Sequence, residues 1–153
     1  MKKTILFLAV GFTVTTATAQ KMKEKDVPLA VNTAFTTKYP KTEAKSWERE
    51  KANFEVEFDY NKAEMSLLID PNGKILETET EIKPAELPKA VTDYCTKNLA
   101  GKKIKEASKI TDDKGTVTYE AEVDEADYIF DSTGAFIKKE VEDKKDNKDE
   151  KKK

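Results

Sequence analysis

Residues 27–31 read Val-Pro-Leu-Ala-Val, and residues 87–91 read Leu-Pro-Lys-Ala-Val. After both stretches, apolar side chains continue at helical spacing: Val31, Ala34, Phe35 and Tyr39 in the first copy, and Val91, Tyr94, Cys95 and Leu99 in the second. A proline near the start of each stretch suits the first turn of a helix, where its missing N–H needs no partner. The chain therefore contains one helical unit twice, with the first helix predicted to end at Pro40 and the second at Gly101.

Strand patterns follow each predicted helix. Residues 54–59 and 119–124 alternate apolar with acidic side chains, a period of two that is typical of a strand with one buried face. Turn signals of Asp followed by Gly occur at residues 70–73, 112–115 and 131–134. We predict an α+β fold in which a unit of one helix plus about four antiparallel strands is duplicated in tandem. Both helices should pack on one face of the sheet, over one core shared by the whole chain.

The N-terminal residues have the features of a secretory signal peptide, predicted at 1–19. Lys2 and Lys3 form its basic region, residues 5–14 are apolar, and Ala17-Thr18-Ala19 is a cleavage pattern that would leave Gln20 first. The apolar run is too short for the alternative, a membrane anchor. The rest divides into a loose leader at 20–26, repeats at 27–86 and 87–141, and a charged tail at 142–153 that is predicted to be disordered. A periplasmic or secreted protein is expected, with no stable membrane insertion after cleavage.

A family resemblance covers about residues 27–141. Residues 27–40 read Val-Pro-x-x-Val-x-x-Ala-Phe-x-x-x-Tyr-Pro, and Trp47, an alternating strand at 54–58 and an Asp-x-x-Gly turn follow in order. This arrangement resembles the PepSY-like, or β-lactamase-inhibitor-like, secreted proteins of Bacteroidetes. The resemblance implies a helix packed on an antiparallel sheet, repeated in tandem. Because a fold does not convey a function, it implies no activity.

The composition removes most catalytic possibilities. The chain has no histidine, which excludes Ser-His-Asp and Cys-His catalysis and the usual zinc sites. Its single cysteine, Cys95, aligns with Phe35 on the apolar helix face and is predicted to be a buried structural thiol. No phosphate-binding glycine loop is present, so no cofactor is predicted. Loss of Lys2 and Lys3 with residues 1–19 lowers the formal net charge from −2 to −4, unlike a nucleic-acid binder.

The alternating strands supply the main candidate surface, an acidic sheet face predicted to point into water. Nine acids could share it: Glu55, Glu57, Asp59, Glu77, Glu79, Glu81, Glu120, Glu122 and Asp124. Such a face either keeps the protein soluble, with lysines pairing across strands, or docks a basic partner or divalent cations. The predicted binding residues are Trp47, Glu55, Glu57, Glu77, Glu79, Glu120 and Glu122. Trp47 is included because tryptophan is a strong interface anchor, although a lone aromatic at this position is more often core. No metal site is assigned, because the loop starting at Asp70 has its glycine too early for a calcium loop.

Two hypotheses for the function remain open. The first is an exported, non-catalytic binding module that inhibits or regulates another envelope or secreted protein or peptide. The alternative is an envelope protein that binds divalent cations through the acidic face. An enzyme that uses paired carboxylates, such as a glycosidase, ranks lowest, because it needs two acids that converge in a concave site.

Overall fold

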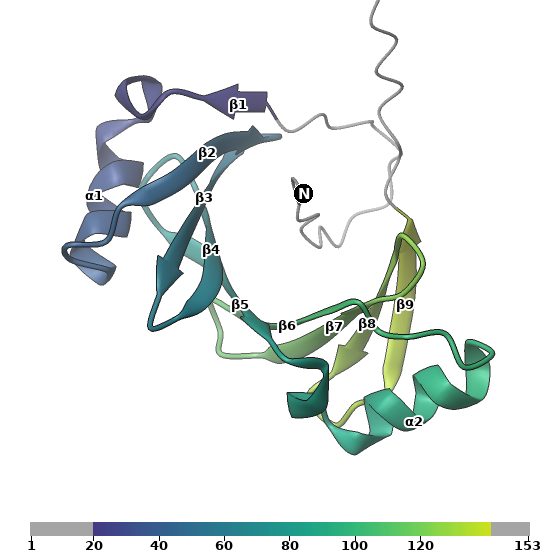
Figure 1. Cartoon of the computed structure of the whole chain (residues 1–153). Coiled ribbons are helices and arrows are strands. Elements are labelled where there is room, and N and C mark those ends of the chain that lie inside the picture. The colour runs from purple at the N-terminus through teal and green to yellow at the C-terminus, as the bar shows by residue number, and fades with distance from the viewer. Residues whose placement is uncertain (1–19, 142–153) are drawn as a thin grey trace, which may run out of the picture.

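The computed structural model describes residues 20–141, so the predicted signal peptide and charged tail lie outside the described residues. Nine strands form one antiparallel sheet in which every strand pairs with its neighbour in the sequence. The strands are β1 (Gln20–Met22), β2 (Ala44–Glu50), β3 (Asn53–Tyr60), β4 (Ala63–Ile69), β5 (Ile75–Ile82), β6 (Glu106–Asp112), β7 (Val117–Glu122), β8 (Ala126–Asp131) and β9 (Phe136–Val141). The sheet bends strongly along its length, so one of its faces is concave (Figure 1).

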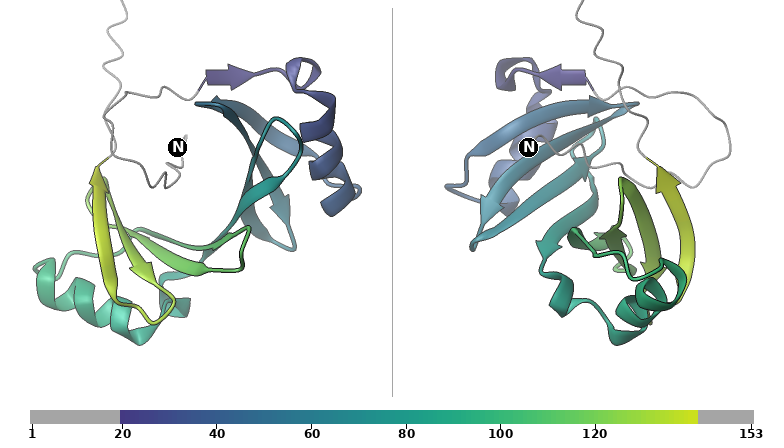
Figure 2. Two further views of the ribbon diagram at one scale, coloured as in Figure 1. Left: turned by 180° about the vertical axis from the view of Figure 1, so that it is seen from behind. Right: turned by 45° about the vertical axis from the view of Figure 1, so that its right-hand side comes forward.

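The two helices are α1 (Leu29–Lys38) and α2 (Lys89–Asn98), and both lie on the outer, convex side of the sheet (Figure 2). Pro28 and Pro88 are the capping residues immediately before the helices, one position earlier than the first helical turn. A 3₁₀ turn precedes each helix, at Glu24–Asp26 and at Pro84–Glu86. The predicted tandem α+β fold, with helices on one face of the sheet, is confirmed.

The segment predicted as a loose leader contains a strand. β1 pairs antiparallel with β2 through Gln20↔Arg49 to Met22↔Trp47. The end of β5 pairs with β6 in the same way in the second copy, where Ile82 pairs with Ala107. Each copy of the unit therefore begins with a strand. The sequence did not show this in the first copy, because three residues are too few for a period-two pattern.

The single shared core predicted from the sequence is wrong, because the structure has two. The first core packs α1 on β2–β4 around Val31, Phe35 and Phe58, and the second packs α2 on β6–β8 around Val91 and Phe130. Each helix covers only the strands of its own repeat, so the apolar residues form two clusters under separate helices. The repeats are joined through the β5–β6 ladder and an ion pair between Lys74 and Asp113.

Two of the predicted Asp–Gly turns hold the helices in place. Gly73 and Gly134 both have φ of +86°, and both lie against the start of a helix. A Cβ atom on Gly73 would approach the carbonyl oxygen of Ala30 to 2.7 Å, and one on Gly134 would approach the Cβ of Ala90 to the same distance. The third turn glycine, Gly115, has φ of +82°, but a Cβ atom there would meet no other heavy atom within 4 Å.

These contacts predict unequal effects of the same substitution. Gly73→Ala and Gly134→Ala should each lower the free energy of unfolding by about 2–4 kcal/mol, since left-handed strain adds to a steric clash. Gly115→Ala should cost only the strain, about 1–2 kcal/mol. Urea denaturation of the three variants measures the difference. Equal losses in the free energy of unfolding would show that the turns at Gly73 and Gly134 do not hold the helices in place.

Candidate functional site

The acids of the alternating strands gather on the concave side of the sheet. Register places Glu57, Ser66 and Glu79 in one row across β3, β4 and β5. A neighbouring row runs from Glu81 through Ser108 to Glu120 across β5, β6 and β7. We define the acidic concave face as Glu55, Glu57, Glu77, Glu79, Glu81, Glu106, Glu120 and Glu122. It includes six of the seven predicted binding residues.

The expectation that these acids point into open water is wrong for its central members. Glu55 is only 3% exposed and Glu79 only 2% exposed. On a flat sheet the outward side chains would splay into solvent, whereas on the inner side of a bent sheet they converge. The concave curvature therefore buries residues that the period-two pattern marks as solvated.

Lysines do not neutralise the centre of the face as expected. Cross-strand neighbours are acids in several places, with Glu48 opposite Glu55 and Glu122 opposite both Glu106 and Asp127. Like charges placed directly opposite each other are destabilising.

Lysines reach only the borders of the face. Lys105 Nζ lies 3.6 Å from Glu122, and Lys138 Nζ lies 2.5 Å from Glu140. Within residues 20–141, no lysine or arginine forms an ion pair with the four glutamates nearest the centre: Glu55, Glu77, Glu79 and Glu120.

Burial and mutual repulsion change how these carboxyl groups ionise. The pKa of Glu55 is raised to about 9, mainly because burial desolvates the carboxyl group and to a smaller extent because Glu50 and Glu79 lie nearby. Desolvation also raises the pKa of Glu77 and of Glu79 to about 7, although a hydrogen bond with Ser108 partly opposes the shift of Glu79. Desolvation is also the main reason why the pKa of Glu120 is raised well above its usual value. Near neutral pH the face thus holds carboxyl groups that would ionise readily if a cation approached.

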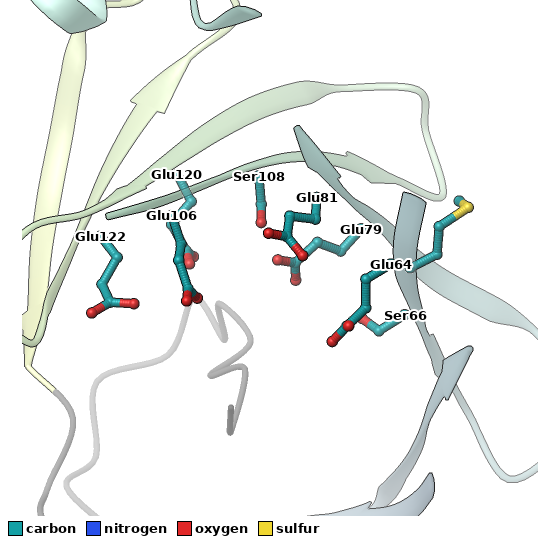
Figure 3. A pocket seen from close by; sticks show the side chains of 9 residues that line it. Glu64, Ser66, Glu79, Glu81, Glu106, Ser108, Glu120 and Glu122 are labelled. Carbon is teal, nitrogen blue, oxygen red and sulfur yellow. The ribbon is translucent and has the colours of Figure 1, made fainter. Parts of the chain in front are cut away.

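A small pocket lies at the centre of the face, where the repeats meet. It has a volume of about 40 Å³ and is lined from β4 and β5 of the first repeat and β6 and β7 of the second. Figure 3 shows its lining residues Glu64, Ser66, Glu79, Glu81, Glu106, Ser108, Glu120 and Glu122. Ser66 is completely buried, and neither its Oγ nor Glu79 Oε2 has a hydrogen-bond partner.

Several residues of the concave side were not predicted from the sequence. Ser66 and Ser108 share strand rows with the predicted acids, and so do three buried apolar residues, Leu68, Ile110 and Ile129. The alternation of side chains along a strand could have identified them. Each lies an odd number of residues from the core residues of its own strand and therefore points to the opposite face. Only the acids form a regular alternation with apolar residues in the sequence, at 54–59 and 119–124.

Three candidates lie elsewhere. Trp47 is 4% exposed and packs edge-on against Phe35, with ring centroids 5.8 Å apart, in the core under α1. It points away from the concave side and has no part in the acidic concave face. Asp124 lies in the β7–β8 turn, where its carboxylate is 2.7 Å from Lys102 Nζ. Asp59 is exposed at the border and pairs with Lys45.

The described residues contain no group of three or more His, Cys, Asp or Glu side chains placed to hold a metal ion. Asp70, which starts the loop compared with a calcium site, instead organises its own turn. Its Oδ1 accepts hydrogen bonds from the backbone N–H groups of Asn72 and Lys74 at 2.8 and 2.9 Å. Asp112 and Asp131 do the same in the other two turns.

Cys95 is 2% exposed on the buried side of α2, and burial raises the pKa of its thiol. Because the thiolate is the reactive form, native protein should react with a thiol reagent far more slowly than unfolded protein. The chain has no other cysteine, so absorbance with a chromogenic disulfide reagent reports this thiol alone. Equal rates in both states would mean that the thiol is accessible.

Comparison with known proteins places the chain in a family. A family model described as "Putative beta-lactamase-inhibitor-like, PepSY-like" matches twice, at residues 12–77 and 76–138. The chain belongs to this PepSY-like family. The two matches correspond to the two structural repeats, and the resemblance drawn from the sequence is confirmed. No curated protein matches the chain.

Solved structures share the fold of this PepSY-like chain. A "BLIP-like protein" from Bacteroides fragilis has a TM-score of 0.60 and 21% identity, over 76% of this chain and 88% of that one. A DUF2874 family protein from Bacteroides uniformis has a TM-score of 0.66 and 18% identity, over 73% and 87%. A "putative periplasmic" protein from Bacteroides eggerthii has a TM-score of 0.67 and 16% identity, over 74% and 88%. In residues 20–141, no helix has the length and apolar character needed to cross a bilayer.

Proposed function

We propose that this protein is an exported, non-catalytic binding module, and that it inhibits or regulates another envelope or secreted protein by binding a basic part of that protein on the acidic concave face. The observation that carries the proposal is the burial of Glu55 and Glu79 without an ion-pair partner among the described residues. Burial disfavours the ionised form of these carboxyl groups, whereas a positive charge beside them would favour it, so a surface that leaves them without an ion-pair partner is suited to a cationic partner.

Other features support a protein partner. Leu68, Ile110 and Ile129 add apolar area among the acids, and protein interfaces combine apolar area with polar groups. The "BLIP-like" and "putative periplasmic" descriptions of proteins with the same fold agree with an exported binding role. An acidic face repels phosphate, so nucleic acid is not a candidate partner.

Capture of a partner from the envelope fraction tests the proposal. A variant with Glu55, Glu57, Glu120 and Glu122 replaced by glutamine should fold but lose the partner that the wild type retains. Capture by the wild type should also weaken as salt rises, because exposed charges are screened over about 8 Å at physiological ionic strength. The charge-matched control replaces four exposed acids outside the face: Glu24→Gln, Asp26→Asn, Glu43→Gln and Asp93→Asn.

Equal capture by wild type and the four-glutamine variant would overturn the proposal. The alternative is divalent-cation binding by the same acids, and calorimetry with calcium chloride on the same proteins tests it. Heat of binding from the wild type, absent in the four-glutamine variant, would favour the alternative.

A further inference from the structure

We propose that the central pocket of the acidic concave face receives the guanidinium group of an arginine side chain from the partner protein. This inference rests on the proposed function and names the group that the face recognises. The pocket is the point where both repeats contribute acids and where two buried polar groups lack partners.

Two buried oxygen atoms of the pocket have no hydrogen-bond partner. Ser66 Oγ is completely buried and unpartnered, and Glu79 Oε2 is equally unpartnered within a residue that is 2% exposed. Buried polar groups are normally satisfied, and the exceptions need an explanation. The same space is lined by the carboxyl groups of Glu64, Glu79, Glu81, Glu106, Glu120 and Glu122. A ligand that carries N–H donors and positive charge would satisfy the two unpartnered oxygens and complement the acidic lining.

The arrangement of the acids favours a guanidinium group over a metal ion. A calcium ion needs six to eight oxygens that converge on one point at about 2.3–2.6 Å, and no described group of acids is placed to hold a metal in that way. A guanidinium group spreads five donors over a planar fork, so it can reach acceptors that are farther apart. It is also more weakly hydrated than the ammonium group of lysine, which favours it in a partly buried site.

The geometry of the sheet also suits a protruding side chain. The pocket lies at the bottom of the concave side, between the two arms of the bent sheet (Figure 3). Leu68 and Ile110 are buried on the same side, and Ile110 lies directly across from Glu79. The aliphatic stem of an arginine can pack on such apolar side chains while its head reaches the acids.

A pair of peptides tests the assignment on the purified protein expressed from the full chain. The probe is Ac-Gly-Gly-Arg-Gly-Gly-NH2, and its matched control carries citrulline, which has the same shape without the charge. We expect the arginine peptide to bind with a Kd of about 1 mM, as suits so small a ligand. NMR signals from the backbone amides of Ser66, Glu79, Ser108 and Glu120 should shift. The citrulline peptide should bind at least about tenfold more weakly.

Variants separate the pocket from the general acidity of the face. Glu79→Gln and, independently, Glu120→Gln should each weaken binding of the arginine peptide by about tenfold or more. Burial raises the pKa of both carboxyl groups, which disfavours their charged form, so a neutral glutamine should be tolerated and the fold retained. Glu43→Gln changes the same charge at an exposed site outside the face and should leave the affinity unchanged.

Several outcomes would overturn the inference. The first is equal binding of the citrulline peptide, or of the same peptide with lysine in place of arginine. The second is unchanged affinity in both pocket variants, and the third is a saturable shift of the same amide signals with calcium chloride alone. If the arginine peptide fails while the four-glutamine variant still loses the captured partner, the proposed function stands and only the pocket assignment falls. If partner capture survives the four glutamines, the proposed function itself falls.

Discussion

Glu55→Gln is expected to stabilise the protein at pH 7 by about 1–3 kcal/mol. Burial and neighbouring acids raise the pKa of Glu55 from 4.5 to about 9 in the folded state. At pH 7 the unfolded chain holds this group ionised, while folding forces it to take up a proton. That uptake costs about 1.4 kcal/mol for each pH unit above the unfolded pKa, or about 3 kcal/mol in all. Glutamine is neutral in both states and avoids the cost.

The amide of the new glutamine also has acceptors nearby. Among the neighbouring acids, Glu50 and Glu79 contribute most to the raised pKa of Glu55. Each of them has a carboxylate oxygen without a hydrogen-bond partner. The gain in the free energy of unfolding should shrink to less than about 1 kcal/mol at pH 5. At that pH the unfolded carboxyl group is close to its own pKa, so protonating it on folding costs little. Urea denaturation at the two pH values measures both effects. Glu43→Gln, at an exposed site, is the control and should change stability by less than about 0.5 kcal/mol.

The sign of the wild-type pH dependence follows from the same groups. Between the unfolded pKa of 4.5 and the folded pKa of about 9, the folded protein binds more protons at Glu55 than the unfolded chain does. The free energy of unfolding therefore falls as pH rises through this window. Glu77 and Glu79, with pKa values of about 7, add to the fall below neutral pH. A stability that instead rose from pH 5 to pH 9 would show that these acids are solvated or paired.

Phe35→Ala is expected to destabilise the protein strongly, by about 3–5 kcal/mol. Phe35 is 2% exposed, and its ring centroid lies 5.1 Å from that of Phe58 and 5.8 Å from that of Trp47. Removing it opens a cavity between α1 and the sheet and removes an aromatic contact from both Phe58 and Trp47. Thermal or urea unfolding measures the loss.

The second repeat provides the matched comparison. Cys95 occupies the position of Phe35 and is equally buried, yet Cys95→Ala removes only a sulfur atom and should cost about 1 kcal/mol. The aromatic contact in this repeat comes from Tyr94, which lies 5.3 Å from Phe130 and stacks on Phe136 at 4.9 Å between ring centroids. Leu99 is only partly buried, so Leu99→Ala should also cost less than Phe35→Ala. Equal losses for Phe35→Ala and Cys95→Ala would contradict the packing described for α1.

Much of the fold could be predicted from local signals. The prolines at 28 and 88 and the helical spacing after them identified two helices, because side-chain periodicity and backbone chemistry act within a few residues. Asp70, Asp112 and Asp131 marked hairpins, because each carboxylate caps the backbone of its own turn. The strand β1 could not be found in this way, since its three residues owe their conformation to pairing with β2.

The duplication, the helices, the hairpins and the side of each strand that carries the acids can all be read from short stretches of the chain. The environment of those acids cannot. Alternation assigns Glu55 and Glu79 to the face opposite the helices, but it carries no information about bending along nine strands. The bend brings side chains from distant strands together, which buries the carboxyl groups, raises their pKa values and forms a pocket between the repeats. Burial is a property of curvature summed over the whole sheet, and no short stretch of sequence encodes it.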